Sequence, residues 1–197
     1  EVGDILLDLT RRETQAFSIS MADSVVKSFE GQVQLINNPH RYAGFRVLQA
    51  HDVPIFAICF GAQALARALG GSVAPGPRAE IGYTWINSDD QDLVANGPWF
   101  QWHYDRFTVP PGAVEIARNP RASQAYVIGR SLAVQFHPEV TTACLEGWLD
   151  EGGIAEAEKD GLDPAELLAG TIREEPAAVQ RAHAIVDAFL DRVVAGP

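Results

Sequence analysis

The sequence predicts a single three-layer α/β domain over residues 1–197, with a mostly parallel sheet and helices on both faces. The run Val53–Ile58 is short and continuously apolar, as expected of a strand buried on both faces of a parallel sheet. It leads directly into an Ala- and Leu-rich helix over 61–69 that ends at Gly70-Gly71. Further strand and helix patterns follow, and their order favours one layered domain.

The elements on either side of this unit follow from periodicity and turn residues. The N-terminal pattern predicts a helix over 4–13, strands over 14–20 and 24–28, a loop over 30–41 and a helix over 45–51. The chain has no initiator Met, and we expect a first strand to be missing upstream of residue 1. Residues 72–111 are dense in Gly, Pro and Trp, which indicates short strands and loops.

The C-terminal half predicts three strands and then two helices. The strands cover 114–117, 125–128 and 131–136, and Gly129-Arg130 marks a tight hairpin between the last two. One helix begins at Asp163-Pro164, with Asp at the N-cap and Pro at the first helical position. A second helix begins at Pro176 and carries an apolar stripe up to Val193.

Composition limits the possible functions. A formal charge of −11 repels phosphate backbones, so we expect no nucleic-acid partner. No apolar run approaches the roughly 18–20 residues that span a bilayer, and we expect no membrane association. Two cysteines are too few for a disulfide framework, which favours the cytoplasm. Because neither a phosphate-binding Gly-rich loop nor a metal-ligand cluster is present, we expect no cofactor and no metal.

Cys59 and His137 are the candidate catalytic pair. Cys59 lies between the buried strand and the helix, where free N–H groups and the helix dipole favour a thiolate. His137 follows a strand directly, and Glu139 two residues later points the same way and can orient the imidazole. Taken alone, Cys59 fits an inert buried cysteine equally well, and His137-Pro138-Glu139 fits an ordinary loop.

Together the two motifs resemble the class I, triad-type glutamine amidotransferases. The family's G-x-C-x-G-x-Q pattern corresponds to residues 57–63 (AICFGAQ), and its second motif corresponds to residues 135–139 (QFHPE). The segment 102–107 (WHYDRF) is similar to the H-G-D-x-F stretch of GMP-synthetase-like members, with Tyr104 in place of Gly. The resemblance is strong over residues 53–140, and it implies a flavodoxin-like fold.

The resemblance also implies residue roles. Cys59 attacks the side-chain amide of glutamine, His137 transfers the proton, and Glu139 orients His137. Phe60, Gly61 and Gln63 match substrate-holding positions, and the Phe60 N–H matches an oxyanion donor. His103 is a further pocket candidate. The family's G-G-P loop, which supplies the second oxyanion donor, is absent, and Gly31 is the nearest counterpart. Ala57 replaces the first Gly of the motif.

These motifs predict hydrolysis of glutamine through a γ-glutamyl thioester on Cys59, with ammonia passing to a separate synthetase subunit. One alternative is a stand-alone hydrolase or transferase that acts on a larger γ-glutamyl amide. Another is a non-catalytic binding module with the same fold. Cys144 is expected to pack rather than react. The four tryptophans form either a pocket wall or core contacts: Trp85, Trp99, Trp102 and Trp148.

Overall fold

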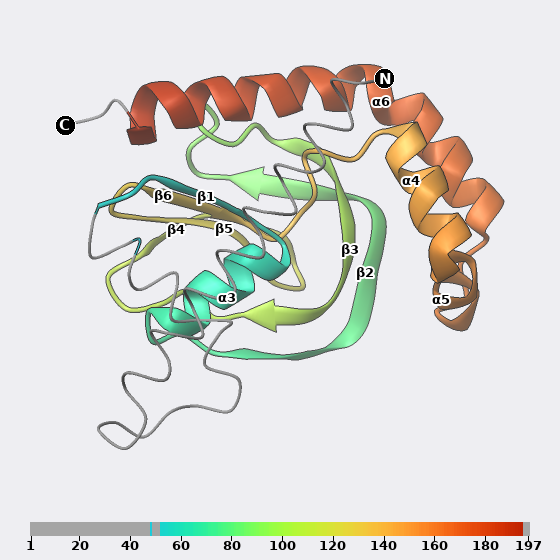
Figure 1. The fold of residues 1–197 in the computed structure, drawn as a ribbon, viewed down its shortest axis with the longest axis horizontal. Coiled ribbons are helices and arrows are strands. Elements are labelled where there is room, and N and C mark those ends of the chain that lie inside the picture. The colour runs from blue at the N-terminus through green and yellow to red at the C-terminus, as the bar shows by residue number, and fades with distance from the viewer. Residues whose placement is uncertain (1–47, 49–51, 195–197) are drawn as a thin grey trace, which may run out of the picture.

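The computed structural model describes residue 48 and residues 52–194, and its six strands form one curled sheet in the order β1-β6-β5-β4-β2-β3 (Figure 1). The strands are β1 (Ile55–Ile58), β2 (Val73–Ser88), β3 (Gly97–Phe107), β4 (Val114–Arg118), β5 (Ser123–Ile128) and β6 (Ser131–Val134). The strands expected over 14–20 and 24–28, and the helices expected over 4–13 and 45–51, fall on residues outside this part, apart from Leu48, which is helical.

The expected α/β class is confirmed, but the sheet is not mostly parallel in the part that the structure describes. Only β1 and β6 pair in parallel, and the other four pairings are antiparallel. The reason is the short connections in this half of the chain, because a two-residue hairpin can join only antiparallel strands. The predicted turn at Gly129-Arg130 is such a hairpin, with Ile128 opposite Ser131.

Both faces of the central strands are covered, as their continuously apolar sequences require. In β1, Ile55 and Ala57 join a cluster with helix α3 (Phe60–Ala68), whereas Phe56 and Ile58 pack on the opposite face. That second face is closed by Ile185 of α6 (Pro164–Ala188) and by the following π-helical segment η3 (Phe189–Val194). Figure 1 shows α6 running along one side of the sheet and α3 on the other.

The region 72–111 contains two long strands instead of the expected short ones. β2 and β3 form an antiparallel ribbon that extends beyond the rest of the sheet. Its register shifts between Pro75 and Glu80, where the Gly- and Pro-rich stretch forms an irregularity within β2. Gly and Pro are tolerated at such bulges, so their density does not break the ribbon.

The C-terminal helices differ from the expectation in two ways. Asp163 caps α6 by accepting from Ala165 N–H at 2.9 Å, as predicted, but Pro176 lies inside this one helix and does not begin a second. Thr171 and Ala178 of α6 are buried, and tertiary packing of this helix offsets the backbone hydrogen bond that Pro176 cannot make. Three short elements also have no counterpart in the sequence prediction: α4 (Thr142–Trp148), η2 (Leu149–Gly153) and α5 (Ile154–Lys159).

The predicted end of α3 at Gly70-Gly71 is confirmed. The Gly71 N–H donates to Ala66 O at 2.8 Å and the Gly70 N–H donates to Arg67 O at 3.4 Å, while Gly70 has a φ of 96°. This pattern is a Schellman motif. A Cβ on Gly71 would lie 2.5 Å from the backbone oxygen of Thr108, so no side chain fits there.

We therefore expect Gly71→Ala to destabilise the protein by about 1–3 kcal/mol, because backbone at the helix end must move. Thermal unfolding measures the effect. Gly147→Ala is the matched control, since a Cβ at this α4 position meets nothing within 4 Å. It should leave the midpoint unchanged or raise it slightly. A Gly71→Ala protein as stable as the wild type would contradict the close approach.

Candidate active site

Cys59 occupies a strained corner between β1 and α3. Its φ of 47° and ψ of −105° place a non-glycine residue in a sparsely populated region of backbone conformation. The Cys59 N–H donates to Val134 O of β6 at 2.8 Å, and its carbonyl accepts from Gln63 N–H at 3.1 Å. Across the corner, a Cβ at Gly61 would lie 3.7 Å from the Cβ of Ala57. This is the strand–corner–helix geometry that exposes a nucleophile at the end of a strand.

His137 lies beside this corner with Glu139 as its partner. Its Nδ1 is 2.7 Å from Glu139 Oε1, and its backbone N–H donates to Phe100 O of β3 at 2.8 Å. The ring is largely buried, while Glu139 is more exposed. Because Nδ1 engages the carboxylate, Nε2 remains for exchanging a proton with a neighbouring group.

Cys59 and Glu139 both act on the pKa of His137. Burial alone lowers this pKa, but hydrogen bonding to Cys59 and Glu139 and the charges of the two groups outweigh it and raise the pKa to about 9. The ring is therefore mainly protonated at neutral pH. A protonated ring can serve as a proton donor at this site.

The sulfur of Cys59 also meets a buried amide. Gln135 Nε2 donates to Sγ at 3.7 Å, and the carbonyl of Trp102 lies 4.0 Å from Sγ. Gln135 is fully buried, and its Oε1 accepts from Gln63 Nε2 at 3.4 Å. An amide donor aimed at sulfur stabilises negative charge there without adding a buried cation.

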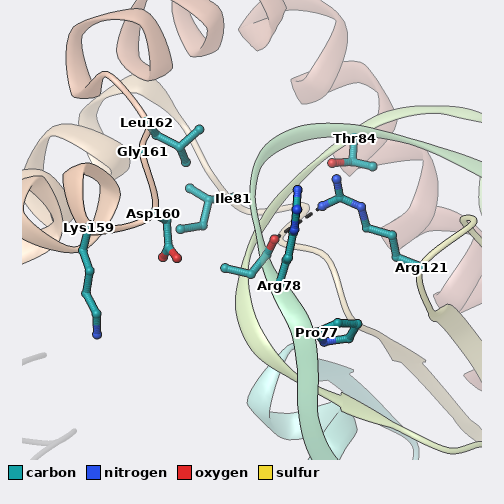
Figure 2. A pocket seen from close by; sticks show the side chains of 10 residues that line it. Pro77, Arg78, Ile81, Thr84, Arg121, Lys159, Asp160, Gly161 and Leu162 are labelled. Carbon is teal, nitrogen blue, oxygen red and sulfur yellow. Dashed lines mark hydrogen bonds between the residues drawn. The ribbon is translucent and has the colours of Figure 1, made fainter.

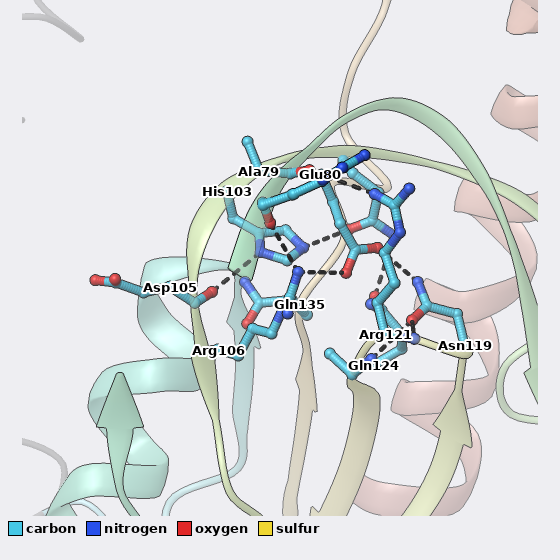
Figure 3. A network of polar contacts seen from close by, with 12 residues as sticks. Ala79, Glu80, His103, Asp105, Arg106, Asn119, Arg121, Gln124 and Gln135 are labelled. Carbon is cyan, nitrogen blue, oxygen red and sulfur yellow. Dashed lines mark hydrogen bonds and ion pairs between the residues drawn. The ribbon is translucent and has the colours of Figure 1, made fainter. Parts of the chain in front are cut away.

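Gln63 and His103, both predicted to bind substrate, lie in a buried polar network, of which Figure 3 shows His103, Asp105 and Gln135. Gln63 Nε2 donates to Asp105 O at 3.0 Å. His103 Nδ1 is 3.0 Å from the same oxygen, and its Nε2 is 3.1 Å from Gln101 Oε1. Burial is the main cause that lowers the pKa of His103. The structure thus places both side chains close to Cys59, but buried beneath the protein surface.

The same network continues to a buried carboxylate. Glu80 Oε2 accepts from Asn119 Nδ2 at 2.6 Å, and its Oε1 is 3.6 Å from Arg106 Nη2. Gln101 Nε2 donates to Gln124 Oε1 at 3.0 Å, so the network links β2, β3 and β5 (Figure 3). Buried polar groups are usually paired, and these contacts fix the ribbon to the sheet, although Arg106 Nε and Gln124 Nε2 have no hydrogen-bond partner among the described residues.

A cavity of about 390 Å³ opens in front of Cys59 and His137. Its described lining residues are Cys59, Trp102, His137, Trp148, Glu151, Gly152, Gly153 and Glu156. The rings of Trp102 and Trp148 pack edge to face with centroids 5.9 Å apart, and Trp148 packs similarly on His137 at 5.2 Å. Of the four tryptophans, therefore, these two form a pocket wall, whereas Trp99 is buried in the core and Trp85 is exposed.

A larger cavity of about 810 Å³ lies between β2 and the end of α5 (Figure 2). Arg78, Arg121 and Lys159 line it together with Asp160. Its described lining contains no cysteine or histidine, so it lacks the groups needed for nucleophilic catalysis.

Within residue 48 and residues 52–194, no group of three or more His, Cys, Asp or Glu side chains is placed to hold a metal ion. No helix in this part is long and apolar enough to cross a membrane.

Comparison with known proteins agrees with this geometry. The profile of the family described as "Glutamine amidotransferase class-I" matches residues 38–145, more than half of the chain. The chain belongs to the class I glutamine amidotransferase family. Two solved structures of similar proteins support this membership. A glutamine amidotransferase of Thermotoga maritima is 28% identical with a TM-score of 0.69, over 74% of this chain and 66% of that one. One from Methylobacillus flagellatus is also 28% identical, with a TM-score of 0.66, over 76% and 67%.

Curated relatives in the family are named GMP synthase [glutamine-hydrolyzing]. The protein of Aeropyrum pernix is 34% identical over 170 residues, which cover 79% of this chain and 32% of the relative. A protein of Thermus thermophilus is 34% identical over 140 residues, which cover 64% and 27%. These matches confirm the predicted resemblance to GMP-synthetase-like members. The chain spans about a third or less of the length of these relatives.

Other predicted site residues stand as follows. Phe60 is exposed at the start of α3, and Gly61 follows it. Gly31 lies outside the described residues, so its part in an oxyanion hole stays a prediction. Sequence reasoning missed Gln135 as a partner of sulfur, although it stands in the QFHPE motif, and it missed Glu151 and Glu156. No periodicity or spacing marks these two glutamates, because only the packing of 142–159 brings them to the cavity.

Glu139→Gln should lower the pKa of His137 from about 9 toward the ordinary value of 6.5, because the variant removes one of the charges that favour the imidazolium. An NMR titration of the ring measures it. Glu158→Gln, an exposed position on α5, is the charge-matched control and should leave the titration unchanged. A His137 pKa insensitive to Glu139→Gln would disprove the coupling.

Gln135→Leu should slow alkylation of Cys59 by iodoacetamide at neutral pH on the order of tenfold, because the hydrogen bond that Gln135 Nε2 donates to Sγ is lost. Gln124→Leu is the control: this glutamine is equally buried in the same network but does not touch sulfur. Both variants should lose stability, and only the first should lose thiol reactivity. Equal alkylation rates in the two would remove Gln135 from the site.

Proposed function

We propose that the chain hydrolyses the side-chain amide of glutamine through a γ-glutamyl thioester on Cys59. The observation that carries this proposal is the Cys59–His137–Glu139 arrangement at the strained corner: the imidazole interacts with both the thiol and a carboxylate 2.7 Å away. Membership of the amidotransferase family supports glutamine as the substrate.

In the proposed reaction, the thiolate of Cys59 attacks the amide carbon and forms the C–S bond. The imidazolium of His137 donates its proton to the amide nitrogen, and the C–N bond breaks to release ammonia. His137, now neutral, takes a proton from water, which attacks the thioester. The C–S bond breaks and restores the thiolate of Cys59 beside the imidazolium of His137, and glutamate leaves after its new carboxyl group loses a proton to solvent. Glu139 keeps Nδ1 engaged throughout, so the same nitrogen, Nε2, serves both steps.

The developing oxyanion needs donors close to Cys59. The Phe60 N–H is the first proposed donor, because it belongs to the residue after the nucleophile and begins α3. Gly31 remains the proposed second donor. Loss of one such donor typically costs about 2.7–4 kcal/mol of barrier.

Ammonia released at Cys59 is proposed to pass to an acceptor-activating synthetase partner. Support comes from the relatives' name, GMP synthase [glutamine-hydrolyzing], and from the match to only about a third of their length. As an alternative, the chain acts on a larger γ-glutamyl amide. A cavity of about 390 Å³ between two tryptophans favours this alternative, since cavities of this size hold ligands larger than glutamine.

Cys59→Ala should abolish ammonia release from glutamine, with a loss of at least roughly 10³-fold, because no thioester can form. A coupled glutamate dehydrogenase assay measures ammonia. Cys144→Ala is the matched control and should retain activity, since Cys144 does not line the cavity. Both variants should keep the wild-type melting temperature within a few degrees.

A glutamine-mimicking diazo-ketone tests the non-catalytic alternative directly. It should label wild-type protein once per chain, at Cys59, and mass spectrometry should find no label on Cys59→Ala. A wild-type protein that neither releases ammonia nor takes the label would reject the proposed function and favour a binding module.

A further inference from the structure

The side-chain amide of Gln63 is linked to the sulfur of Cys59 through one other amide. Gln63 Nε2 is 3.0 Å from Asp105 O and 3.4 Å from Gln135 Oε1, and Gln135 Nε2 is 3.7 Å from Sγ. We infer that Gln63 is a positioning residue, which makes the Gln135 amide turn its NH₂ end and not its carbonyl oxygen toward the sulfur. The consequence for catalysis rests on the proposed function, and this role differs from the substrate contact that the sequence motif implies for Gln63.

The direction of the Gln63 amide is set by a backbone carbonyl. A carbonyl oxygen only accepts hydrogen bonds, so the Gln63 atom that lies 3.0 Å from Asp105 O must be the nitrogen. The two ends of an amide side chain have nearly the same shape, and only their partners distinguish them. Asp105 O therefore decides which end of Gln63 points toward it.

The strand pairing leaves this carbonyl available to side chains. Asp105 lies opposite Pro75 in the β2–β3 ribbon, and proline has no N–H to donate. The register shifts directly after Pro75, and β3 is the last strand in the order of the described sheet. A second side-chain donor, His103 Nδ1, lies 3.0 Å from Asp105 O. Gln63 and His103 thus use both lone pairs of this oxygen.

The direction passes from Gln63 to the sulfur in one step. With one N–H directed at Asp105 O, Gln63 presents its other N–H to Gln135, and the Gln135 atom that meets it must be the oxygen. The opposite end of that amide, Nε2, then faces Sγ of Cys59. A reversed Gln135 would place two NH₂ groups against each other at one end and an oxygen lone pair against the sulfur at the other.

Burial makes this direction consequential. Gln63 is 7% exposed and Gln135 is fully buried, so water has little access to replace a missing partner. Leaving a buried donor or acceptor unpaired costs about 1–3 kcal/mol, which is enough to favour one orientation of Gln135 strongly. The sulfur that attacks the substrate in the proposed reaction is therefore held against a donor by a residue that does not touch it.

Two substitutions at Gln63 test the inference, each made alone and together with Gln135→Leu. Gln63→Met removes the donor at a similar side-chain volume. Gln63→Glu keeps the shape, but a carboxylate only accepts, and a protonated carboxyl has one proton for two acceptors. Gln135 is then expected to turn its Nε2 toward position 63. The measurement is the rate of Cys59 alkylation by iodoacetamide, and Cys144 in the same sample monitors unfolding, which would speed the alkylation of both cysteines.

Gln63→Glu should slow alkylation of Cys59 on the order of tenfold, and Gln63→Met should slow it roughly twofold to threefold. In the Gln135→Leu background, Gln63→Met should have no further effect, and Gln63→Glu should keep only the smaller effect of its charge. Gln124→Leu, which is buried in the same network, should leave the rate unchanged in either background. No slowing by either Gln63 substitution, or the same slowing with and without Gln135, would overturn the inference.

The wild-type protein allows a test that needs no substitution. In NMR spectra, the side-chain amide protons of Gln135 should show nuclear Overhauser effects to the Cβ protons of Cys59. Gln135→Leu identifies these amide resonances, because they disappear in that variant. Gln135 amide protons that lie instead against the amide protons of Gln63 would overturn the inference.

Glutamine turnover separates positioning from direct substrate contact. Gln63→Met should lower kcat by a factor similar to its effect on alkylation, with KM within about twofold of the wild type. A raised KM at unchanged kcat would identify Gln63 as a substrate contact and overturn the inference. A wild-type protein that releases no ammonia would remove the proposed function, whereas the alkylation rates would still decide on Gln63, because they require no glutamine.

Discussion

The parallel pairing of β1 with β6 is the constraint on which the candidate site depends. Ile58 lies opposite Val134, and the Cys59 N–H extends the ladder by donating to Val134 O. Parallel strands end at the same edge of a sheet, so residues that follow the two strands meet there. This pairing brings Cys59 and His137 together although 78 positions separate them in the sequence. A one-residue slip would move every side chain to the other face and separate them.

The ribbon of β2 and β3 supplies the rest of the site and its support. Phe100 of β3 accepts the backbone N–H of His137, and Trp102 on the same strand forms the cavity wall. Farther along, Tyr104 donates to Asp160 at 2.8 Å, which ties β3 to the end of α5. The strand thus contacts the loop that carries His137 and the segment that bears Glu151 and Glu156. Through it, the position of His137 and the wall of the cavity depend on one element.

Local features of the chain were predictable because they depend on neighbouring residues. The corner at Cys59, the cap at Gly70-Gly71, the hairpin at Gly129-Arg130 and the cap at Asp163 each follow from a few adjacent side chains. The pairing of His137 with Glu139 also lies within one short motif.

Features set by distant packing were not predictable in the same way. Pro176 reads as a helix start, but tertiary contacts of α6 override its local preference. The Gly- and Pro-rich stretch of β2 reads as loop, yet pairing with β3 holds it in a ribbon. Gln63 and His103 were predicted to face substrate, but their amide and ring atoms meet carbonyl oxygens and amides inside the protein. Which way a polar side chain turns is decided by such partners, and these partners are remote in the sequence.

The polarity of the groups around Cys59 also has a chemical logic. A buried lysine or arginine at the position of Gln135 would place a fixed charge beside the sulfur, and a thiolate stabilised by such a charge is a weaker nucleophile. A neutral amide at 3.7 Å offers the sulfur a donor without a fixed charge, and the positive charge is left to His137, which gives up its proton in the proposed reaction. The amide is itself held by Gln63, whose backbone N–H closes the first turn of α3 on Cys59. The residue that completes the strained corner is therefore also the one that orients the donor to sulfur, so the geometry of the corner and the reactivity of the thiol are not independent.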